Sequence, residues 1–373
     1  MTETTHSKLH ELSALGQSVW IDSVSREWLE TGFLEKLMRE HAVVGVTSNP
    51  TIFQKALATG EWYDEQLREV LGEEDDPKEV FYRLAVRDIQ AACDLLRPVW
   101  DGGGGRDGYV SMEVDPTLAY DEEATITEAL RLHEWIDRPN LFVKIPATVP
   151  GLVAIEECIA HGRSINVTLI FSLERYAAVA ESYIRGLERL VTGGGDPETV
   201  ASVASFFVSR VDTEADKRLE AIGSDEALAL RGKLAVANAK LAYRRYGEIF
   251  SDGRWEALAE RGATPQRCLW ASTSTKNPDY PATLYVDELI GPDTVNTMPV
   301  ETVEAFQQDG RVERTLDQGL DEAEEVFEAL KRLGVDYDDV TETLEREGVQ
   351  KFSDSFDELL EGIRSKRAEL APA

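Results

Sequence analysis

The 373-residue sequence has few of the features that mark secreted or membrane proteins. Its three cysteines, Cys93, Cys158 and Cys268, are too far apart to form a CxxC pair or a disulfide framework. No apolar run is long enough to cross a bilayer, and the first residues, MTETTHSKLHELSALGQ, are polar. We therefore expect a protein of the reducing cytoplasm that is neither secreted nor held in a membrane.

Positive charge is also scarce. The chain has 39 lysines and arginines against 70 acidic residues, a formal net charge of -31. This balance argues against nucleic-acid binding, which needs a basic footprint, and against binding to anionic membrane surfaces. Two interpretations stay open, an acidic surface that favours solubility and an adaptation to high salt. An anionic substrate would have to be held by a few local cations.

Motifs for metals and nucleotides are missing as well. The five histidines are scattered, and no HExxH, EF-hand or P-loop spacing occurs. Gly103, Gly105 and Gly108 match GxGxxG, but they precede an expected strand, whereas the dinucleotide fingerprint follows a strand and opens a helix. We therefore predict a flexible connector at these glycines, and we expect neither a metal nor a cofactor.

Short β-rich runs alternate with longer amphipathic stretches along the chain. Eight strands that are each followed by helix fit a parallel α/β fold, the (β/α)8 TIM barrel. The alternative, a doubly wound sheet, usually has fewer strands and a glycine turn after the first. The expected strands are Ser18–Asp22, Val43–Asn49, Tyr109–Val114, Leu141–Ile145, Ile165–Phe171, Ser202–Val208, Cys268–Ser272 and Thr294–Met298.

The barrel is expected to form one domain over residues 1–373. Residues 1–17 are an N-terminal extension in this interpretation. Residues 303–373 read as several acidic helices, which we expect to pack on the barrel as a C-terminal helical extension.

Polar side chains gather toward the C-terminal ends of the expected strands. Because side chains alternate along a strand, one parity faces the barrel interior and the other faces the helices. Barrel enzymes build their active sites at this end of the strands. The alternative is a structural hydrogen-bond network around one buried Lys–Glu pair. The interior parity carries Asp22, Asn49, Glu113, Lys144, Asn166 and Thr168.

Lys144 is the most informative of these residues, because it interrupts the apolar run LFVKIPAT. A desolvated lysine can become a neutral amine that attacks carbonyls, although a snorkelling or ion-paired lysine is the structural alternative. As a nucleophile it would form an iminium with a ketose, and the iminium permits cleavage of the adjacent C–C bond. Glu113 would then shuttle protons, Asp22 would serve as the base for cleavage, and Asn49 and Asn166 would bind hydroxyls.

The segments around these residues resemble the transaldolases, class I Schiff-base enzymes on a (β/α)8 barrel. The resemblance runs from about Ser18 to Val300, with the segments in the same order. The connection from Gln54 to Gly108 and the C-terminal tail are similar to the longer bacterial branch of the family. The matching segments are WIDSVSR, GVTSNPTIF, SMEVDP, FVKIPAT, INVTLIFS and ASFFVSRVD.

The resemblance implies a reaction of the non-oxidative pentose phosphate pathway. A dihydroxyacetone unit moves from sedoheptulose 7-phosphate or fructose 6-phosphate to glyceraldehyde 3-phosphate or erythrose 4-phosphate. By the family pattern Lys144 forms the Schiff base, Glu113 and Thr168 hold the catalytic water, and Asp22 is the acid/base. The residues that would bind substrate are Asn49, Asn166, Ser205, Phe207, Arg210 and Lys276.

Two cations are candidates for the phosphate. Arg210 lies just beyond the sixth strand and suits a bidentate phosphate contact, unless it forms a surface salt bridge with Asp212 or Glu214. Lys276, in STSTKNP after the seventh strand, occupies a place where the family often carries arginine. Lysine binds phosphate as a point charge without the fork geometry.

Two other functions stay open. A fructose-6-phosphate-type class I aldolase would use the same scaffold and release free dihydroxyacetone. Relatives of that kind carry an amide at the Glu113 position and tyrosine at the Phe207 position, so this chain favours the transferase. A more remote alternative is a non-enzymatic barrel that binds sugar phosphates. We expect small-molecule sugar phosphates as partners, no nucleic acid or membrane, and a monomer or homodimer.

Overall fold

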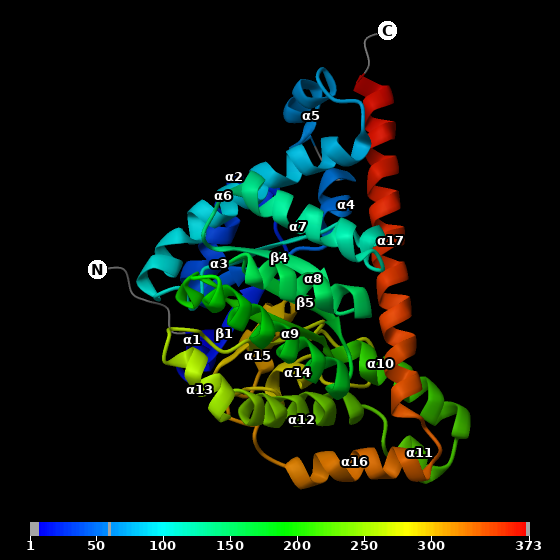
Figure 1. Ribbon diagram of the computed structural model, residues 1–373. Coiled ribbons are helices and arrows are strands. Elements are labelled where there is room, and N and C mark those ends of the chain that lie inside the picture. Colours follow the sequence, from blue (N-terminus) through cyan, green and yellow to red (C-terminus); the bar gives the residue numbers. More distant parts are fainter. Residues whose placement is uncertain (1–6, 59–60, 371–373) are drawn as a thin grey trace.

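The computed structural model describes residues 7–58 and 61–370. At its centre lies a closed barrel of eight parallel strands in sequential order, in which β1 pairs with β8 (Figure 1). The expected barrel and its eight strands are thereby confirmed. The strands are β1 (Gln17–Ile21), β2 (Val43–Val46), β3 (Val110–Glu113), β4 (Leu141–Pro146), β5 (Ile165–Ile170), β6 (Ser202–Phe207), β7 (Arg267–Ala271) and β8 (Thr294–Met298).

The largest error in the strands is at β2, which ends at Val46 and not at Asn49. The chain leaves the sheet there because Asn49 caps the following helix: its Oδ1 accepts a hydrogen bond from the Ile52 N–H at 3.1 Å. Similar caps start two helices that directly follow strands. Thr148 accepts from the Gly151 N–H, and Ser172 accepts from the Arg175 N–H.

Helices surround the barrel, and two further long helices follow it (Figure 1). None of the helices in the described part of the chain combines the length and apolarity needed to cross a bilayer. The helices are α1 (Lys8–Ala14), α2 (Arg26–Glu30), α3 (Phe33–His41), α4 (Pro50–Ala58), α5 (Asp64–Leu71), α6 (Pro77–Gly102), α7 (Glu122–Ile136), α8 (Val149–Ala160), α9 (Leu173–Thr192), α10 (Val208–Ile222), α11 (Asp225–Leu228), α12 (Leu234–Ile249), α13 (Gly253–Ala259), α14 (Leu284–Asp287), α15 (Val300–Asp309), α16 (Leu320–Arg332) and α17 (Tyr337–Leu370), with short 3-10 turns η1 (Pro116–Leu118) and η2 (Pro197–Thr199).

The N-terminal end of the barrel is closed by packed side chains. The Tyr109 and Phe142 rings stack with centroids 4.1 Å apart, and the Trp20 ring lies 6.1 Å from Phe142. A Cβ atom at Gly45 would lie 2.4 Å from the Trp20 indole, so this approach requires glycine. Arg267 bonds Asp107 at 3.0 Å at the same end. The open, polar end is therefore the C-terminal one.

The glycine-rich segment before β3 is a turn that connects α6 to β3, as the predicted connector requires. Helix α6 ends at Gly102, and Gly104, Gly105 and Gly108 all have positive φ. A Cβ atom at Gly108 would lie 2.5 Å from the backbone nitrogen of Trp100, so this close approach requires glycine. These glycines serve the turn between α6 and β3, and they open no helix that could bind a dinucleotide.

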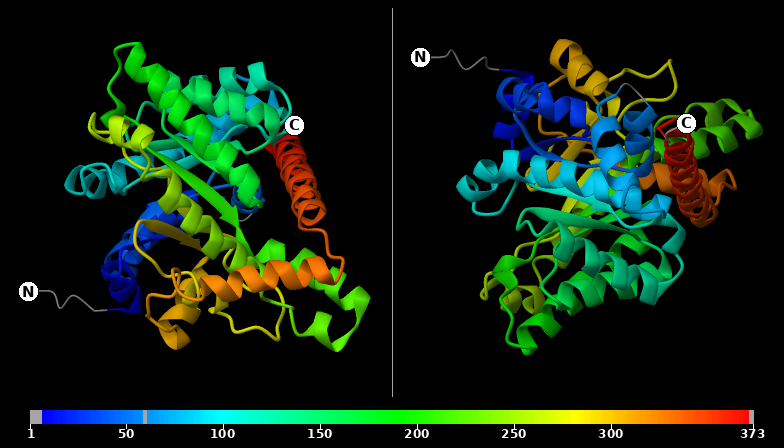
Figure 2. Two further views of the ribbon diagram at one scale, coloured as in Figure 1. Left: turned by 60° about the horizontal axis from the view of Figure 1, so that its bottom comes forward. Right: turned by 90° about the horizontal axis from the view of Figure 1, so that it is seen from above.

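Helix α17 crosses the C-terminal end of the barrel. It runs the length of the molecule, from beside α10 to beside α4 and α5 (Figures 1 and 2). Ion pairs anchor both of its ends: Glu345 pairs with Arg175 at 3.1 Å, and Lys366 with Asp64 at 2.8 Å. The acidic tail thus forms a strap over the strand ends.

Candidate active site

Lys144 and Glu113 face each other inside the barrel. The Lys144 Nζ atom lies 3.3 Å from Glu113 Oε2 and donates a hydrogen bond to the Ser48 carbonyl oxygen at 2.9 Å. Strand register explains the pairing, because Glu113 on β3 is level with Lys144 on β4, which is level with Asn166 on β5. Both side chains are buried, Lys144 at 5% and Glu113 at 7% exposure. The interior parity expected for these strands is confirmed.

Burial raises the pKa of two carboxyl groups of the site, those of Glu113 and Asp22. It raises the pKa of Glu113, against the opposing charges of Lys144 and Arg210. Burial also raises the pKa of Asp22 to about 6, with a smaller push from Glu301 and opposition from the Ser23 hydrogen bond and from Lys276 and Lys144. Asp22 follows the last residue of β1. A carboxyl with this pKa can exchange protons near neutral pH, as an acid or base in catalysis must.

Asn166 is held between two serine hydroxyls. Its Nδ2 donates to Ser111 Oγ at 3.1 Å, and its Oδ1 accepts from Ser205 Oγ at 2.7 Å. Asn166 and Ser205 are therefore oriented before any ligand binds. Thr168 is different: its Oγ1 is buried and forms no hydrogen bond with any described residue. A buried hydroxyl without a protein partner is a ready site for water or substrate.

Arg210 lies in the first turn of α10, just after Phe207 ends β6. Its guanidinium carbon sits 4.8 Å from the centre of the Phe207 ring and 5.7 Å from that of Phe352. The alternative salt bridges are wrong, because Asp212 accepts from the Tyr285 hydroxyl and Glu214 pairs with neighbouring cations. Arg210 is in no salt bridge within the described chain, so it is available to bind an anion.

Lys276 lies on the loop after β7, at the C-terminal end of the barrel, which we call the mouth. Its Nζ donates to Ser274 Oγ at 2.7 Å. Burial lowers the pKa of Lys276, Asp22 raises it, and the positive charges of Lys351 and Arg210 lower it further. Lys276 therefore feels the charges of both Asp22 and Arg210. Direct contacts link Lys144 with Glu113, Asn166 with Ser205, and Arg210 with Phe207. Thr168 is level with Pro146 on β4, and the charges of Asp22 and Lys276 act on each other. Asn49 follows Ser48, whose carbonyl accepts from Lys144, but its own side chain caps α4.

Two participants were not found from the sequence. The Ser48 carbonyl is a backbone group, and no residue pattern marks it. Phe352 of α17 lies over the site, 6.0 Å from the ring centre to Lys144 Nζ, and its ring packs on Phe207 at 6.1 Å. The apolar stripe Val349–Phe352–Phe356 within the acidic tail was a visible signal that α17 buries one face. The stripe did not indicate which surface of the protein this face of α17 packs against.

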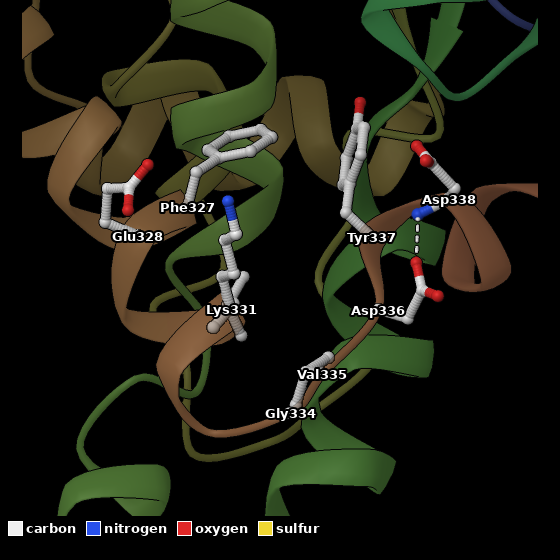
Figure 3. Close-up of a pocket in the computed structure, with 9 residues that line it drawn as sticks. Phe327, Glu328, Lys331, Gly334, Val335, Asp336, Tyr337 and Asp338 are labelled. Carbon is white, nitrogen blue, oxygen red and sulfur yellow. Dashed lines mark hydrogen bonds between the residues drawn. The ribbon is translucent and has the colours of Figure 1, made fainter.

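A groove beside the C-terminal helices lies away from this site. A cavity of about 500 Å³ between α16 and α17 is lined by Phe327, Lys331, Asp336 and Tyr337, among others (Figure 3). The Phe327 and Tyr337 rings are 4.8 Å apart. None of the catalytic candidates lines this cavity, so we do not place the chemistry there.

Comparison with known proteins identifies the family of the chain. The family model of transaldolase/fructose-6-phosphate aldolase matches residues 19–363. A transaldolase of Frankia alni is 55% identical over 353 residues, which cover 94% of this chain and 95% of the relative. A transaldolase of Thermobifida fusca is 52% identical over 363 residues, 97% of this chain and 99% of the relative. Transaldolase 2 of Streptomyces coelicolor is 48% identical over 366 residues, 98% of each chain. The chain therefore belongs to the transaldolase/fructose-6-phosphate aldolase family, and its full-length similarity to transaldolases supports that transferase activity.

Proposed function

We propose that this transferase moves a dihydroxyacetone unit between sugar phosphates through a Schiff base on Lys144. The observation that carries the proposal is the buried amine itself, 3.3 Å from Glu113 at the C-terminal end of the barrel, with Asp22 nearby. The neutral Nζ attacks the ketose carbonyl carbon and forms a carbinolamine. Loss of water from this adduct leaves an iminium, which withdraws electrons from the sugar chain.

Glu113 and Thr168 are proposed to handle the water and its protons. The carbinolamine hydroxyl needs a proton to leave as water, and hydrolysis of the Schiff base needs water to return. The raised pKa of Glu113 favours a carboxyl that can give and take this proton. The unpartnered Thr168 hydroxyl supports a place for the water beside it.

Asp22 is proposed as the acid/base of C–C cleavage. It removes the proton from the hydroxyl next to the breaking bond, the bond electrons move to the iminium nitrogen, and an aldose phosphate leaves. The resulting enamine attacks the carbonyl of an acceptor aldose phosphate, and Asp22 returns the proton to the new hydroxyl. Its pKa of about 6 suits both directions near neutral pH.

The proposed substrates are the phosphorylated ketoses and aldoses of the non-oxidative pentose phosphate pathway. Arg210 and Lys276 would hold the phosphate together with Ser205 and Phe207 of β6; of these, Phe207 contacts Arg210. Asn49 and Asn166 would bind hydroxyls of the sugar. We further propose a cytoplasmic enzyme, monomer or homodimer, that forms one barrel domain with extensions at 1–17 and 303–373.

Two side chains distinguish this chain from the fructose-6-phosphate-type aldolases. Glu113 lies against Lys144 as a carboxylate and not as an amide, and the position at the end of β6 is Phe207 and not tyrosine. Both favour transfer to an acceptor over release of free dihydroxyacetone.

Borohydride trapping tests the nucleophile. Incubation with fructose 6-phosphate and borohydride, followed by peptide mass mapping, should place a reduced adduct on Lys144. A Lys144→Ala variant is the control, with an unchanged circular dichroism spectrum and no adduct. An adduct elsewhere, or turnover by this variant, would refute the role of Lys144. Product analysis with and without erythrose 4-phosphate separates the two activities, because rapid release of dihydroxyacetone without an acceptor is the aldolase result.

A further inference from the structure

The barrel-facing side of α17 contributes residues directly to the mouth. A Cβ atom at Gly348 would lie 3.5 Å from the Arg210 guanidinium and 3.1 Å from Leu169, so the helix backbone passes very close to both. One turn later the Phe352 ring lies 5.7 Å from the same guanidinium. Residues three and four apart share a helix face, so Lys351 stands on the side of α17 that borders Arg210.

Lys351 is a cation of α17 that has no ion-pair partner among the described residues. Its side chain is exposed, and it forms no hydrogen bond or salt bridge with the described residues. Most arginines on the surface of this acidic chain are paired; Arg254, for example, pairs with Glu181 and Glu188. An unpaired lysine next to an unpaired arginine is therefore unusual in a chain of net charge -31.

Two positive charges act on Lys276. Those of Lys351 and Arg210 each lower its pKa, after the larger effects of burial, which lowers it, and of Asp22, which raises it. Asp22 and Glu301 are the acidic groups that act on Lys276, and neither is within salt-bridge distance of it. Asp22 and Glu301 offset part of the repulsion at Lys276, and a bound anion would offset it further.

We propose that Lys351 is a third cation of the phosphate site, and so a specificity-determining residue for phosphorylated sugars. It would complete a triangle with Arg210 from α10 and Lys276 from the β7 loop, and each would face a phosphate oxygen. This inference rests on the proposed function for the identity of the sugar, but the anion site itself does not depend on the Schiff base. It also gives the C-terminal helix a direct role in substrate selection.

Binding of inorganic phosphate to the full chain tests the cation cluster without turnover. Isothermal calorimetry at constant ionic strength should show Lys351→Gln weakening phosphate binding roughly three- to ten-fold. Lys351→Arg keeps the charge and should bind about as well as the unchanged protein. The matched control is Arg346→Gln, which removes one exposed positive charge from the same helix; Arg346 contacts Thr343 and is not among the groups that act on Lys276.

Kinetics then separates a phosphate contact from a general effect. Lys351→Gln should raise KM for fructose 6-phosphate by a similar factor and leave kcat unchanged. It should not alter kcat/KM for unphosphorylated fructose. Equal losses in Lys351→Gln and Arg346→Gln, or unchanged phosphate binding in Lys351→Gln, would overturn the proposal. If Lys144 fails to trap substrate while phosphate binding depends on Lys351, the proposed mechanism fails and the phosphate site stands.

Discussion

Replacing Asp22 by asparagine is expected to make the protein more stable at neutral pH and to slow catalysis. The carboxyl has a pKa of about 6 in the folded chain against an ordinary value of 3.8, with burial as the main cause. Each pKa unit corresponds to about 1.36 kcal/mol, so ionised Asp22 lowers the free energy of unfolding by up to about 3 kcal/mol. Asparagine is nearly isosteric, and its Oδ1 can still accept the Ser23 hydroxyl.

The sign of the pH dependence follows from the raised pKa. Below pH 3.8 the Asp22 carboxyl is protonated in both the folded and the unfolded chain, so it does not change the free energy of unfolding. Between pH 3.8 and about 6 the unfolded chain ionises first, so stability falls as pH rises, and above about 6 the full cost is present. The advantage of the Asp22→Asn variant should therefore be largest above pH 7 and shrink steadily toward pH 4.

Urea unfolding followed by circular dichroism at several pH values measures this difference. Asp279→Asn is the matched control, because Asp279 is an exposed aspartate in the loop that carries Lys276. It should show no comparable gain in stability. Borohydride trapping at Lys144 should persist in Asp22→Asn while kcat falls by about 10²- to 10⁴-fold. The reasoning is refuted if the variant is no more stable than the unchanged protein at pH 7.5, or if the gain is the same at pH 4.5.

Two further predictions concern the two ends of the barrel. Phe352→Ala should lower the free energy of unfolding by about 3–5 kcal/mol and raise KM, because the buried ring joins α17 to Phe207. Urea unfolding measures the loss of stability, which should be smaller for Phe352→Leu. A loss below about 1 kcal/mol for Phe352→Ala would contradict the prediction. Arg267→Met should cost about 3 kcal/mol by leaving Asp107 without its cation. Activity per folded molecule should stay unchanged, and a fall in kcat would show that this end is not merely structural.

The sequence predicts the barrel well because local patterns encode parallel strands. Strands buried on both faces read as short continuous apolar runs, and the expected β8 agrees with the observed strand at both ends. The error at β2 has a local cause as well: Thr47 and Ser48 look like strand residues, but Asn49 turns the chain into α4. Helices α4 and α5 lie in a segment expected only as a long connection.

The arrangement of the candidate active site was also largely determined by the sequence. Side-chain alternation is a property of the strand itself, so Glu113, Lys144 and Asn166 had to share the interior once their strands joined one barrel. Their distances follow from the register of neighbouring strands. The raised pKa of Asp22 is different, because it depends on how much protein surrounds the carboxyl.

The cover of the mouth was decided by tertiary structure alone. The tail shows an amphipathic pattern, which predicts that α17 buries one face but not which surface receives it. Only folding brings Phe352 over Lys144 and beside Arg210, since these residues are far apart in the chain and meet through long-range packing. The sequence by itself determined the barrel and the interior position of Lys144, because both arise from local periodicity. The cover of the site by α17 arises through contacts that no local pattern encodes.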